Sequence, residues 1–471
     1  MPSNSREIQS SNAQNFPRCK KWGGLFLVAL FALVVLNAGR VAAQKVATDP
    51  GVREGVSAGS AIAGLSAAQQ AFFSAGLAKF RQLASVTGSV PNTRKGLGPG
   101  FNALSCAQCH SQPAIGGSSP AVNPQIGAAI AKGASNQIPS FITARGPVRV
   151  VRFPYAVDMN HPDGSVHSLF TIAGRSDAAG CKLVQPDFKQ AAEKGNLIFR
   201  IPTPMFGSGL MEAIPDSAIV ENVNADASTK HSLGIAGSPN FSPNDFSITR
   251  FGWKAQNKSL EMFAGEADNV EIGVTNDLFP NELFPNDAGE VSGCLFNSTP
   301  EDTAGFAADG SVIASDNVRF AGFARFLDQP RPVASTASTI HGQQVFTQIG
   351  CALCHTPALT TGQASVGALS KVQANLFSDL LLHHMGPRLA DNVVQGVAQG
   401  DEFRTAPLWG LGQRIFFLHD GRTGDLIKAI EEHSSGKDAH YGDSEANGVV
   451  GNFRKLTEGE KQDLLNFLRS L

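Results

Sequence analysis

Apolar residues recur at helical spacing near both ends of the chain, and each of these stretches begins with a capping sequence. Ser66-Ala67-Ala68-Gln69 is a capping-box pattern. The apolar positions after it are three or four residues apart and predict one face of a helix: Phe73, Leu77, Phe80 and Leu83. Thr457-Glu458-Gly459-Glu460 is a second capping box, and it precedes a leucine stripe that predicts a C-terminal helix. A further helix is expected over residues 339–349.

The middle of the chain, residues 111–330, has weak periodicity and is rich in Gly, Pro and Asn. β-type runs at 148–153 and 197–201 predict short strands, and a helix is expected over 254–265. The segment is too long for a simple loop, so it is an insertion or a domain of its own. The predicted fold class is therefore mainly α, with a long, loop-rich insertion that contains some short β-strands.

The pattern C-x-x-C-H occurs twice, and it is the attachment signature of c-type haem. Cysteines three positions apart lie on one side of a helical turn, so both sulfurs reach the vinyl groups of one porphyrin. The His that follows places an imidazole nitrogen on the iron. The alternative is a zinc or dithiol site, but zinc needs a second half roughly 12–20 residues away, and neither copy has one. The predicted attachment residues and iron ligands are Cys106, Cys109, His110, Cys351, Cys354 and His355.

Each motif follows a predicted helix and a turn, which is the order found at the start of a cytochrome c domain. We therefore expect two cytochrome c-like haem domains, at residues 44–330 with the insertion and at residues 331–471. The cofactors implied by the motifs are two covalently bound c-type haems.

Residues 1–43 have the pattern of a signal peptide: basic residues, an apolar run and small residues before a cleavage point. The apolar run, Leu25–Leu36, is shorter than the roughly 20 residues of a membrane span. An uncleaved anchor is the alternative, but export is favoured, with membrane contact only during export. The net charge of -2 and the lack of a dense Lys/Arg run argue against a nucleic-acid partner.

The cysteines also indicate export to the periplasm. Of the seven cysteines, four belong to the haem motifs and Cys19 lies in the export segment. Cys181 and Cys294 remain, an even pair in an oxidising compartment, and a disulfide between them is expected. Two unpaired buried thiols are the alternative.

The two haems differ in their candidate sixth ligands. Met385 follows the second motif at a suitable distance, and a Met opposite His is typical of an electron-carrying haem. A core Met, or His383 or His384 as ligand, is the alternative. No Met or His lies between His110 and Met159. More distant candidates for the first haem are Met159, His161, His167, Met205 and Met211. An open metal position favours chemistry at the first haem and electron delivery at the second.

A peroxide as oxidant requires an acid–base group to move a proton between its oxygens. Glu212 lies in an apolar, Gly-containing segment where desolvation raises the pKa of a carboxyl group. A Glu at the edge of a buried turn is the equal alternative. Trp253 and Trp409 are candidates for an electronic link between the haems, with a role in the core as the alternative.

Three polar residues near the second motif are candidates for contacts to haem propionates: Arg404, Thr405 and His419. Arginine forks suit carboxylates. A structural salt bridge is the equal alternative for these residues.

Five runs in combination resemble the bacterial di-haem oxidoreductase family, whose members are labelled thiol oxidoreductases or peroxidases. The runs are Gly98–Ser105, Phe251–Gln256, Leu381–Gly386, Phe403–Gly410 and Leu418–Arg422. The family is related more distantly to di-haem cytochrome c peroxidases and MauG-type enzymes. The resemblance covers residues 60–471.

The resemblance implies two packed haem domains, one haem catalytic or of low potential and the other ligated by Met. Met385 matches the family's ligand position. A calcium ion between the domains is also implied, without ligands that we can name. Two departures concern the second haem: His384 stands where Asp is expected, and His433–Gly436 reads His-Ser-Ser-Gly where His-Gly-Gly-Glu is expected.

The sequence therefore predicts a periplasmic di-haem oxidoreductase that is peroxidase-like. A small redox protein or small molecule would deliver electrons through the second haem to an oxidant at the first. One alternative is a non-enzymatic electron-transfer cytochrome with both irons six-coordinate. Another is oxidation of a thiol or protein substrate, with electrons running in the opposite direction.

Overall fold

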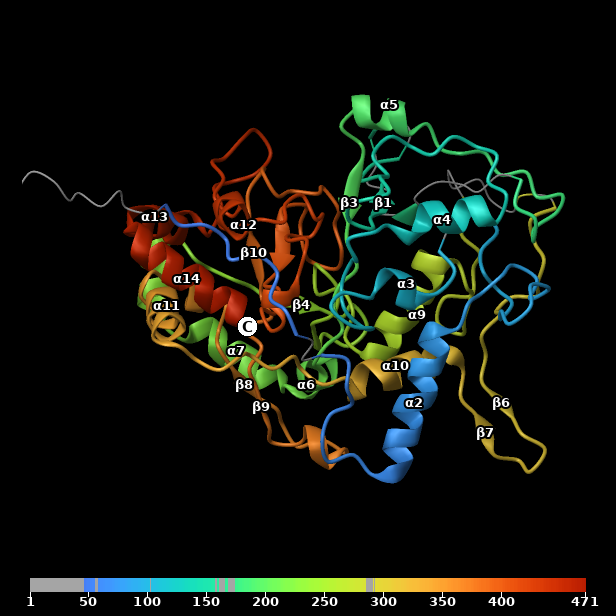
Figure 1. The fold of residues 1–471 in the computed structure, drawn as a ribbon, viewed down its shortest axis with the longest axis horizontal. Coiled ribbons are helices and arrows are strands. Elements are labelled where there is room, and N and C mark those ends of the chain that lie inside the picture. Colours follow the sequence, from blue (N-terminus) through green and yellow to red (C-terminus); the bar gives the residue numbers. More distant parts are fainter. Residues whose placement is uncertain are drawn as a thin grey trace, which may run out of the picture. The chain divides into compact units, whose positions relative to one another are not determined.

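Helices provide most of the regular structure of the chain (Figure 1). The N-terminal and central helices are α2 (Ala67–Arg81), α3 (Cys106–Cys109), α4 (Pro124–Ala131), α5 (Phe188–Glu193), α6 (Ser208–Ala213), α7 (Asp216–Asn224), α8 (Ala227–Leu233), α9 (Leu260–Ile272) and α10 (Asp316–Phe326). The C-terminal helices are α11 (Ala337–Gln348), α12 (Leu426–Glu432), α13 (Asn447–Lys455) and α14 (Glu458–Ser470), with 3₁₀ turns η2 (Cys351–Leu353), η3 (Gly367–Leu369) and η4 (Leu411–Gln413).

This computed structural model describes residues 46–471 except 56–57, 102, 157–158, 161–165, 168–173, 285–290 and 292. Ala47–Leu471 form one unit by their contacts. The expected export segment, residues 1–43, lies outside the described residues. In the described part, every helix is too short or too polar to span a bilayer. The predicted division into domains at residue 330 stays a prediction.

Strands are short, and they pair antiparallel throughout the described residues. They are β1 (Val150–Arg152), β2 (Val166–His167), β3 (Ile198–Arg200), β4 (Asn240–Phe241), β5 (Ile248–Thr249), β6 (Gly305–Phe306), β7 (Val312–Ile313), β8 (Leu359–Thr360), β9 (Gln373–Ala374), β10 (Leu382–His384) and β11 (Glu402–Arg404). β1 lies between β2 and β3 in one small sheet, and the others form two-stranded pairs. The predicted mainly α class is confirmed at this level.

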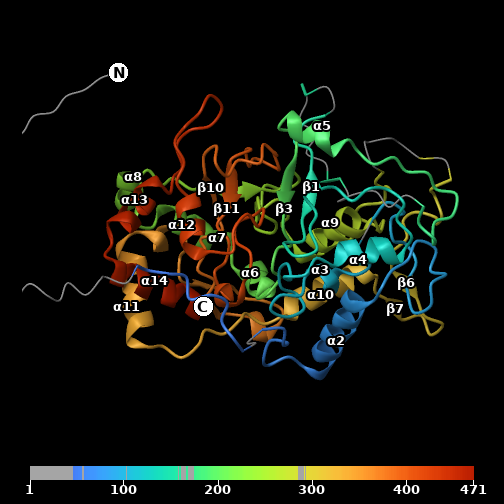
Figure 2. The same cartoon turned by 45° about the horizontal axis from the view of Figure 1, so that its top comes forward.

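Two helix pairs support the two haem motifs. α2 packs against α10, and α11 packs against α14; both pairs lie side by side in Figures 1 and 2. Phenylalanines at the first pair form a buried cluster that includes Phe73, Phe80 and Phe323. The second pair shares a core that includes Phe346 and Leu465, with Cys351 packed against it. Cys106 packs against the first cluster, so each motif lies against an apolar helix pair.

The local sequence signals at the chain's outer helices are confirmed. Ser66 and Gln69 form the expected capping box before α2, and Thr457 and Glu460 form the one before α14. α11 begins two residues earlier than expected because Thr336 caps it. The expected strands appear as β1 and β3, paired with each other.

The predicted helix over 254–265 is wrong in its boundaries. α9 begins at Leu260 because the Ser259 side chain accepts a hydrogen bond from the Met262 amide and caps it. Ala255 instead has a positive φ of 51°. The tight turn at Gly252 also has a positive φ, 88°, and a Cβ there would collide with the Gln256 side chain. This turn sets the directions of Trp253 and Gln256.

The expected disulfide is confirmed. Cys181 and Cys294 are bonded across a sequence separation of 113 residues, with their Cα atoms 4.6 Å apart. The four motif cysteines are free thiols. A bridge of this kind belongs to proteins of oxidising compartments.

Candidate functional site

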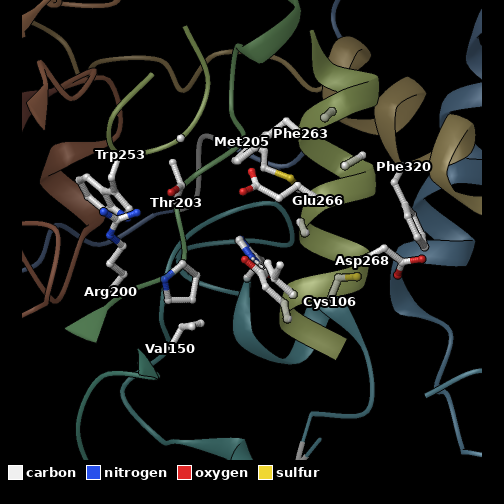
Figure 3. Close-up of a pocket in the computed structure, with 18 of the residues that line it drawn as sticks. Cys106, Val150, Arg200, Thr203, Met205, Trp253, Phe263, Glu266, Asp268 and Phe320 are labelled. Carbon is white, nitrogen blue, oxygen red and sulfur yellow. Dashed lines mark hydrogen bonds and ion pairs between the residues drawn. The ribbon is translucent and has the colours of Figure 1, made fainter. Parts of the chain in front are cut away.

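Both C-x-x-C-H motifs line cavities. The first cavity, of about 100 Å³, is lined by Cys106 and His110 (Figure 3). The second, of about 230 Å³, is lined by Cys351, Cys354 and His355. The second cavity is thus about twice the volume of the first.

The two motif histidines are held in the tautomer that a metal ligand needs. Nδ1 of His110 lies 3.1 Å from the Gly117 carbonyl oxygen, and Nδ1 of His355 lies 3.0 Å from that of Phe377. A carbonyl only accepts, so Nδ1 carries the proton and donates it, which leaves Nε2 of His355 for a metal. Nε2 of His110 lies 3.4 Å from a carboxylate oxygen of Glu271, a long contact that an iron on this nitrogen would replace. Burial lowers the pKa of His355 to about 4, so its ring is neutral. The residues present thus fit a haem at each motif.

The second cavity is mostly apolar, with walls from β10, β11 and the helices around the α11–α14 pair. Met385 follows β10 directly and lines this cavity. Pairing of Leu382 with Arg404 and of His384 with Glu402 fixes the register of β10 on β11. The structure therefore brings Met385 into the same cavity as His355.

His383 and His384 are engaged elsewhere. Nε2 of His383 lies 2.9 Å from Asp379 and Nδ1 lies 2.7 Å from Glu445. Both carboxylates accept, so both ring nitrogens carry protons and neither is free for a metal. His384 is half-exposed, pairs with Asp401 and Glu402, and is not among the residues that line the second cavity.

His433 is a residue that the sequence reasoning did not consider as a ligand. Its Nδ1 donates to the Ala429 carbonyl at 2.7 Å, and it lines the second cavity. Burial lowers the pKa of His433 below its ordinary value. Its Nε2 is thus available, as in the motif histidines, which makes His433 a rival to Met385. Its place within the departing run His433–Gly436 was the available signal.

The first cavity is lined by three carboxylates of α9: Glu266, Asp268 and Glu271. Figure 3 shows Cys106, Met205 and Glu266 around this cavity. The carboxylate of Glu266 accepts hydrogen bonds from the side-chain amides of Gln256, at 3.3 Å, and Asn257. Glu266 was missed by the sequence reasoning because no local pattern distinguishes it from the other acidic residues of α9.

Of the five ligand candidates for the first haem, Met205 lines the first cavity. Met211 is buried in the core that also contains Leu210 and Ile214, and Met159 is not among the residues that line either motif's cavity. His161 lies outside the described residues, as does the side chain of His167.

Glu212 lies outside the first cavity. Its carboxylate accepts from Arg325 Nε at 2.6 Å and Nη2 at 3.2 Å, and from the Leu260 amide at 2.9 Å. These contacts tie α6 to α9 and α10. The expected acid–base role of Glu212 therefore gains no support from its position, whereas Glu266 faces the cavity.

Trp253 lines both motif cavities and a small third cavity of about 20 Å³. Its Nε1 donates to the Ile201 carbonyl at 3.0 Å, and its ring meets that of His419 edge-on at 6.4 Å. Trp409 lines the third cavity and packs in the core. Of the two tryptophans, Trp253 is thus the one that borders both motif cavities.

A buried charge network lies beside Trp253. Asp391 accepts from Arg200 Nε and Nη2 at 3.1 and 2.5 Å, and Lys254 Nζ lies 3.1 Å from its other oxygen. Lys254 also donates to the carbonyls of Gln399 and Glu402, both at 2.7 Å. Burial would raise the pKa of Asp391, but the two cations lower it to about 2.

Two further arginines face the second cavity, Arg404 and Arg414. Burial lowers the pKa of each to about 10. Arg404 was a predicted propionate contact, and Thr405 and His419 line the same cavity. Arg414 was not predicted.

Among the described residues, no cluster of three or more acidic side chains within metal-binding range offers a site for the implied calcium ion. In the described part of the chain, one group of three or more potential ligands lies within metal-binding range: Cys354, Asp379 and His383. Calcium prefers six to eight oxygen ligands, and a thiol with an imidazole does not provide them. Calcium stays a prediction without a site.

Comparisons with known proteins give one family match. The family model described as "Di-haem oxidoreductase, putative peroxidase" matches residues 168–471, which is more than half of the chain. No curated protein matches. Among solved structures, a MauG-like protein associated with microbial copper homeostasis is 16% identical, with a TM-score of 0.30, over 57% of this chain and 90% of that one. Hydrazine synthase of Kuenenia stuttgartiensis is 16% identical, with a TM-score of 0.21, over 40% and 65%.

Proposed function

The chain belongs to the di-haem oxidoreductase family, and we propose that it is a periplasmic c-type enzyme that reduces peroxide at the first cavity. Electrons enter at the second cavity from a small redox protein or a small molecule. The observation that carries this proposal is the inequality of the two cavities: a carboxylate held by two amides faces the first, and Met385 faces the second.

Two haems, bound covalently to the motif cysteines, supply the change of redox state when present. His355 would hold an iron through Nε2, and His110 would do so in place of its long contact to Glu271. Met385 would supply a thioether ligand at the second motif. The matched family and the two His-containing cavities support this assignment.

Glu266 moves the proton that peroxide reduction requires. Its carboxylate lines the first cavity, and the side-chain amides of Gln256 and Asn257 fix its orientation. A carboxylate so placed takes a proton from one oxygen of a peroxide and returns it to the other. Trp253 borders both cavities and provides the aromatic bridge between donor and acceptor sides.

Export to the periplasm is supported by the cysteines. The Cys181–Cys294 disulfide suits an oxidising compartment, and the free motif thiols are available for haem. Covalent haem attachment takes place outside the cytoplasmic membrane, so the same compartment serves both.

One observation favours the electron-transfer rival: Met205 lines the first cavity and offers a thioether there. Optical and EPR spectra of the purified protein, with and without hydrogen peroxide, separate the two functions. The enzyme shows a first iron that is open or exchangeable and reacts with peroxide. Two low-spin irons in every redox state, inert to peroxide, would establish the rival. A peroxide-treated protein that oxidises a thiol or protein substrate would support the reverse electron flow.

A further inference from the structure

Arg414 borders two cavities. It follows η4 and lines both the second cavity and the small third cavity that Trp253 shares. Among the described residues, no hydrogen bond or ion pair is found for its side chain. Its backbone N–H donates to the Leu411 carbonyl at 3.1 Å, and its backbone carbonyl accepts from Arg469 at 3.0 Å. Arginine does not lose its charge in proteins. Arg414 thus presents an unmatched cation to the cavity.

Arg404 adds a second cation to the same cavities. It is 4% exposed, and its Nε and Nη1 donate to the carbonyls of Gly252 and Thr405 at 3.0 and 3.1 Å. These partners are neutral. Burial, together with repulsion from Arg414, lowers the pKa of Arg404 to about 10.

Several other buried arginines in the described part of the chain have carboxylate partners. Arg200 pairs with Asp391 at 2.5 Å, and Arg94 pairs with Asp268 at 2.9 Å. Arg404 is buried and Arg414 partly buried, and neither has a carboxylate in hydrogen-bonding contact. Such neighbouring cations are unfavourable, since each loses hydration and they repel each other. Asp379 attracts Arg404, but less strongly than Arg414 repels it. An anionic ligand removes both penalties, and carboxylates match the arginine fork.

We propose that Arg404 and Arg414 form an anion site for the propionate carboxylates of the haem bound at Cys351 and Cys354. The proposal rests on the proposed function in requiring a haem in the second cavity. Both arginines also line the third cavity with Trp253, so carboxylates held by them would lie on the side of the second cavity that Trp253 borders. The two arginines thereby orient the second haem for electron exchange.

The test compares the holoprotein with its Arg414→Gln, Arg414→Lys and Arg388→Gln variants. Arg388 is the matched control because its half-exposed side chain lies 3.7 Å from Glu432, away from the cavity lining. Haem stoichiometry, the midpoint potential of the second haem and its resonance Raman propionate bands are measured for each protein. None of these readouts depends on turnover.

Arg414→Gln is expected to keep both covalent haems and to lower the equilibrium constant for reduction of the second haem about tenfold. This corresponds to a midpoint potential about 59 mV lower for a one-electron couple. A lost positive charge next to the propionates favours the oxidised iron. Arg414→Lys keeps the potential near the wild-type value but shifts the propionate bands, because an ammonium lacks the fork. Arg388→Gln changes neither.

Unchanged propionate bands in Arg414→Lys overturn the proposal even where Arg414→Gln fails to accumulate. An unchanged potential in Arg414→Gln with both haems bound also overturns it. A wild-type protein without haem on Cys351 and Cys354 overturns this proposal and the proposed function together. A wild-type protein that binds both haems but is inert to peroxide overturns only the function, and the Arg414 comparison then still decides the anion site.

Discussion

The two cavities begin with the same five-residue motif and differ in the charges around it. Three carboxylates of α9 line the first cavity, together with Arg152 and Arg200. Of the described residues that line the second, only Glu445 carries a carboxylate, and it is bound to His383, whereas Arg404 and Arg414 are cations. Negative charge stabilises an electron-poor iron and positive charge an electron-rich one. The motif thus sets the attachment, and the surrounding segments set the role.

Asp391 maintains this difference on the first side. It neutralises Arg200, which lines the first cavity, and it holds Lys254, whose Nζ lies 4.1 Å from the centre of the Phe403 ring of the second cavity. The second cavity has no such carboxylate for Arg404 and Arg414 among its described lining residues. The charge contrast is therefore a property of specific pairs, and single substitutions can remove it.

The largest expected effect comes from Glu266→Gln, which removes the proton carrier of the first cavity. The rate of reaction with peroxide should fall about 10²–10⁴-fold, with both haems retained, as measured by stopped-flow absorbance. Glu212→Gln is the matched control: it loses the ion pair with Arg325 and should lower the melting temperature while leaving the rate near wild type. A slow Glu212→Gln with a normal Glu266→Gln would show that the sequence-based prediction was right and the cavity-based one wrong.

Asp391→Asn should have the next largest effect. Arg200 and Lys254 would lose their counter-charge while remaining buried, which costs about 3–5 kcal/mol of unfolding free energy. Urea unfolding followed by circular dichroism measures this loss. Asp245→Asn breaks an exposed pair with Lys258 and should change stability little. Equal unfolding midpoints for the two variants would mean that the network does not stabilise the region between the cavities.

How far the sequence predicted the site depends on how local each signal was. The capping boxes at Ser66 and Thr457 and the haem motifs act within a few residues, and the helices they predict are present. Glu212 was chosen for its apolar neighbours, but its partner Arg325 is 113 residues away. Such a pairing is set by tertiary packing, which the local sequence does not contain.

The residues that were missed share this property. Arg414 and His433 belong to the second cavity only because segments from distant parts of the chain meet there. Likewise, the sequence left His383 open as an alternative ligand. In the structure its Nδ1 is hydrogen-bonded to Glu445, which is 62 residues away. Met385 and Trp253 were predicted, and both line the cavities expected of them. Their roles as ligand and bridge stay predictions.

Met385→Leu tests whether Met385 is the sixth ligand of the second haem, which the proposed electron entry at the second cavity requires. The substitution should abolish the Met–iron charge-transfer band at the red end of the spectrum and lower the potential of the second haem. The first haem should keep its spectrum. Survival of the band would show that Met385 is not the ligand, and a spectrum of two histidines already present in the wild type would indicate His433 in its place.

The smallest expected effect concerns pH, because the charges of the two cavities should change differently between pH 5 and 8. Burial raises the pKa of Asp268 to about 7, above its ordinary 3.8, although Arg94 opposes the shift. In the second cavity, burial lowers the pKa values of His355 and His419 to about 4. It lowers those of Arg404 and Arg414 only to about 10, so both stay charged in this range. Between pH 5 and 8, the charge of the first cavity should therefore change more than that of the second.

The sign of this effect follows from proton binding. Between about pH 4 and 7 the native state keeps the Asp268 proton and the unfolded state does not, so the unfolding free energy falls as pH rises through this window. Asp268→Asn removes that contribution, and its melting temperature should fall less than the wild type's from pH 5 to 8. Glu282, whose pKa burial raises to about 8, adds a slope of the same sign to both proteins, so their difference isolates Asp268. Parallel curves for the two proteins would place the pH sensitivity outside the first cavity and remove this distinction between the two motifs.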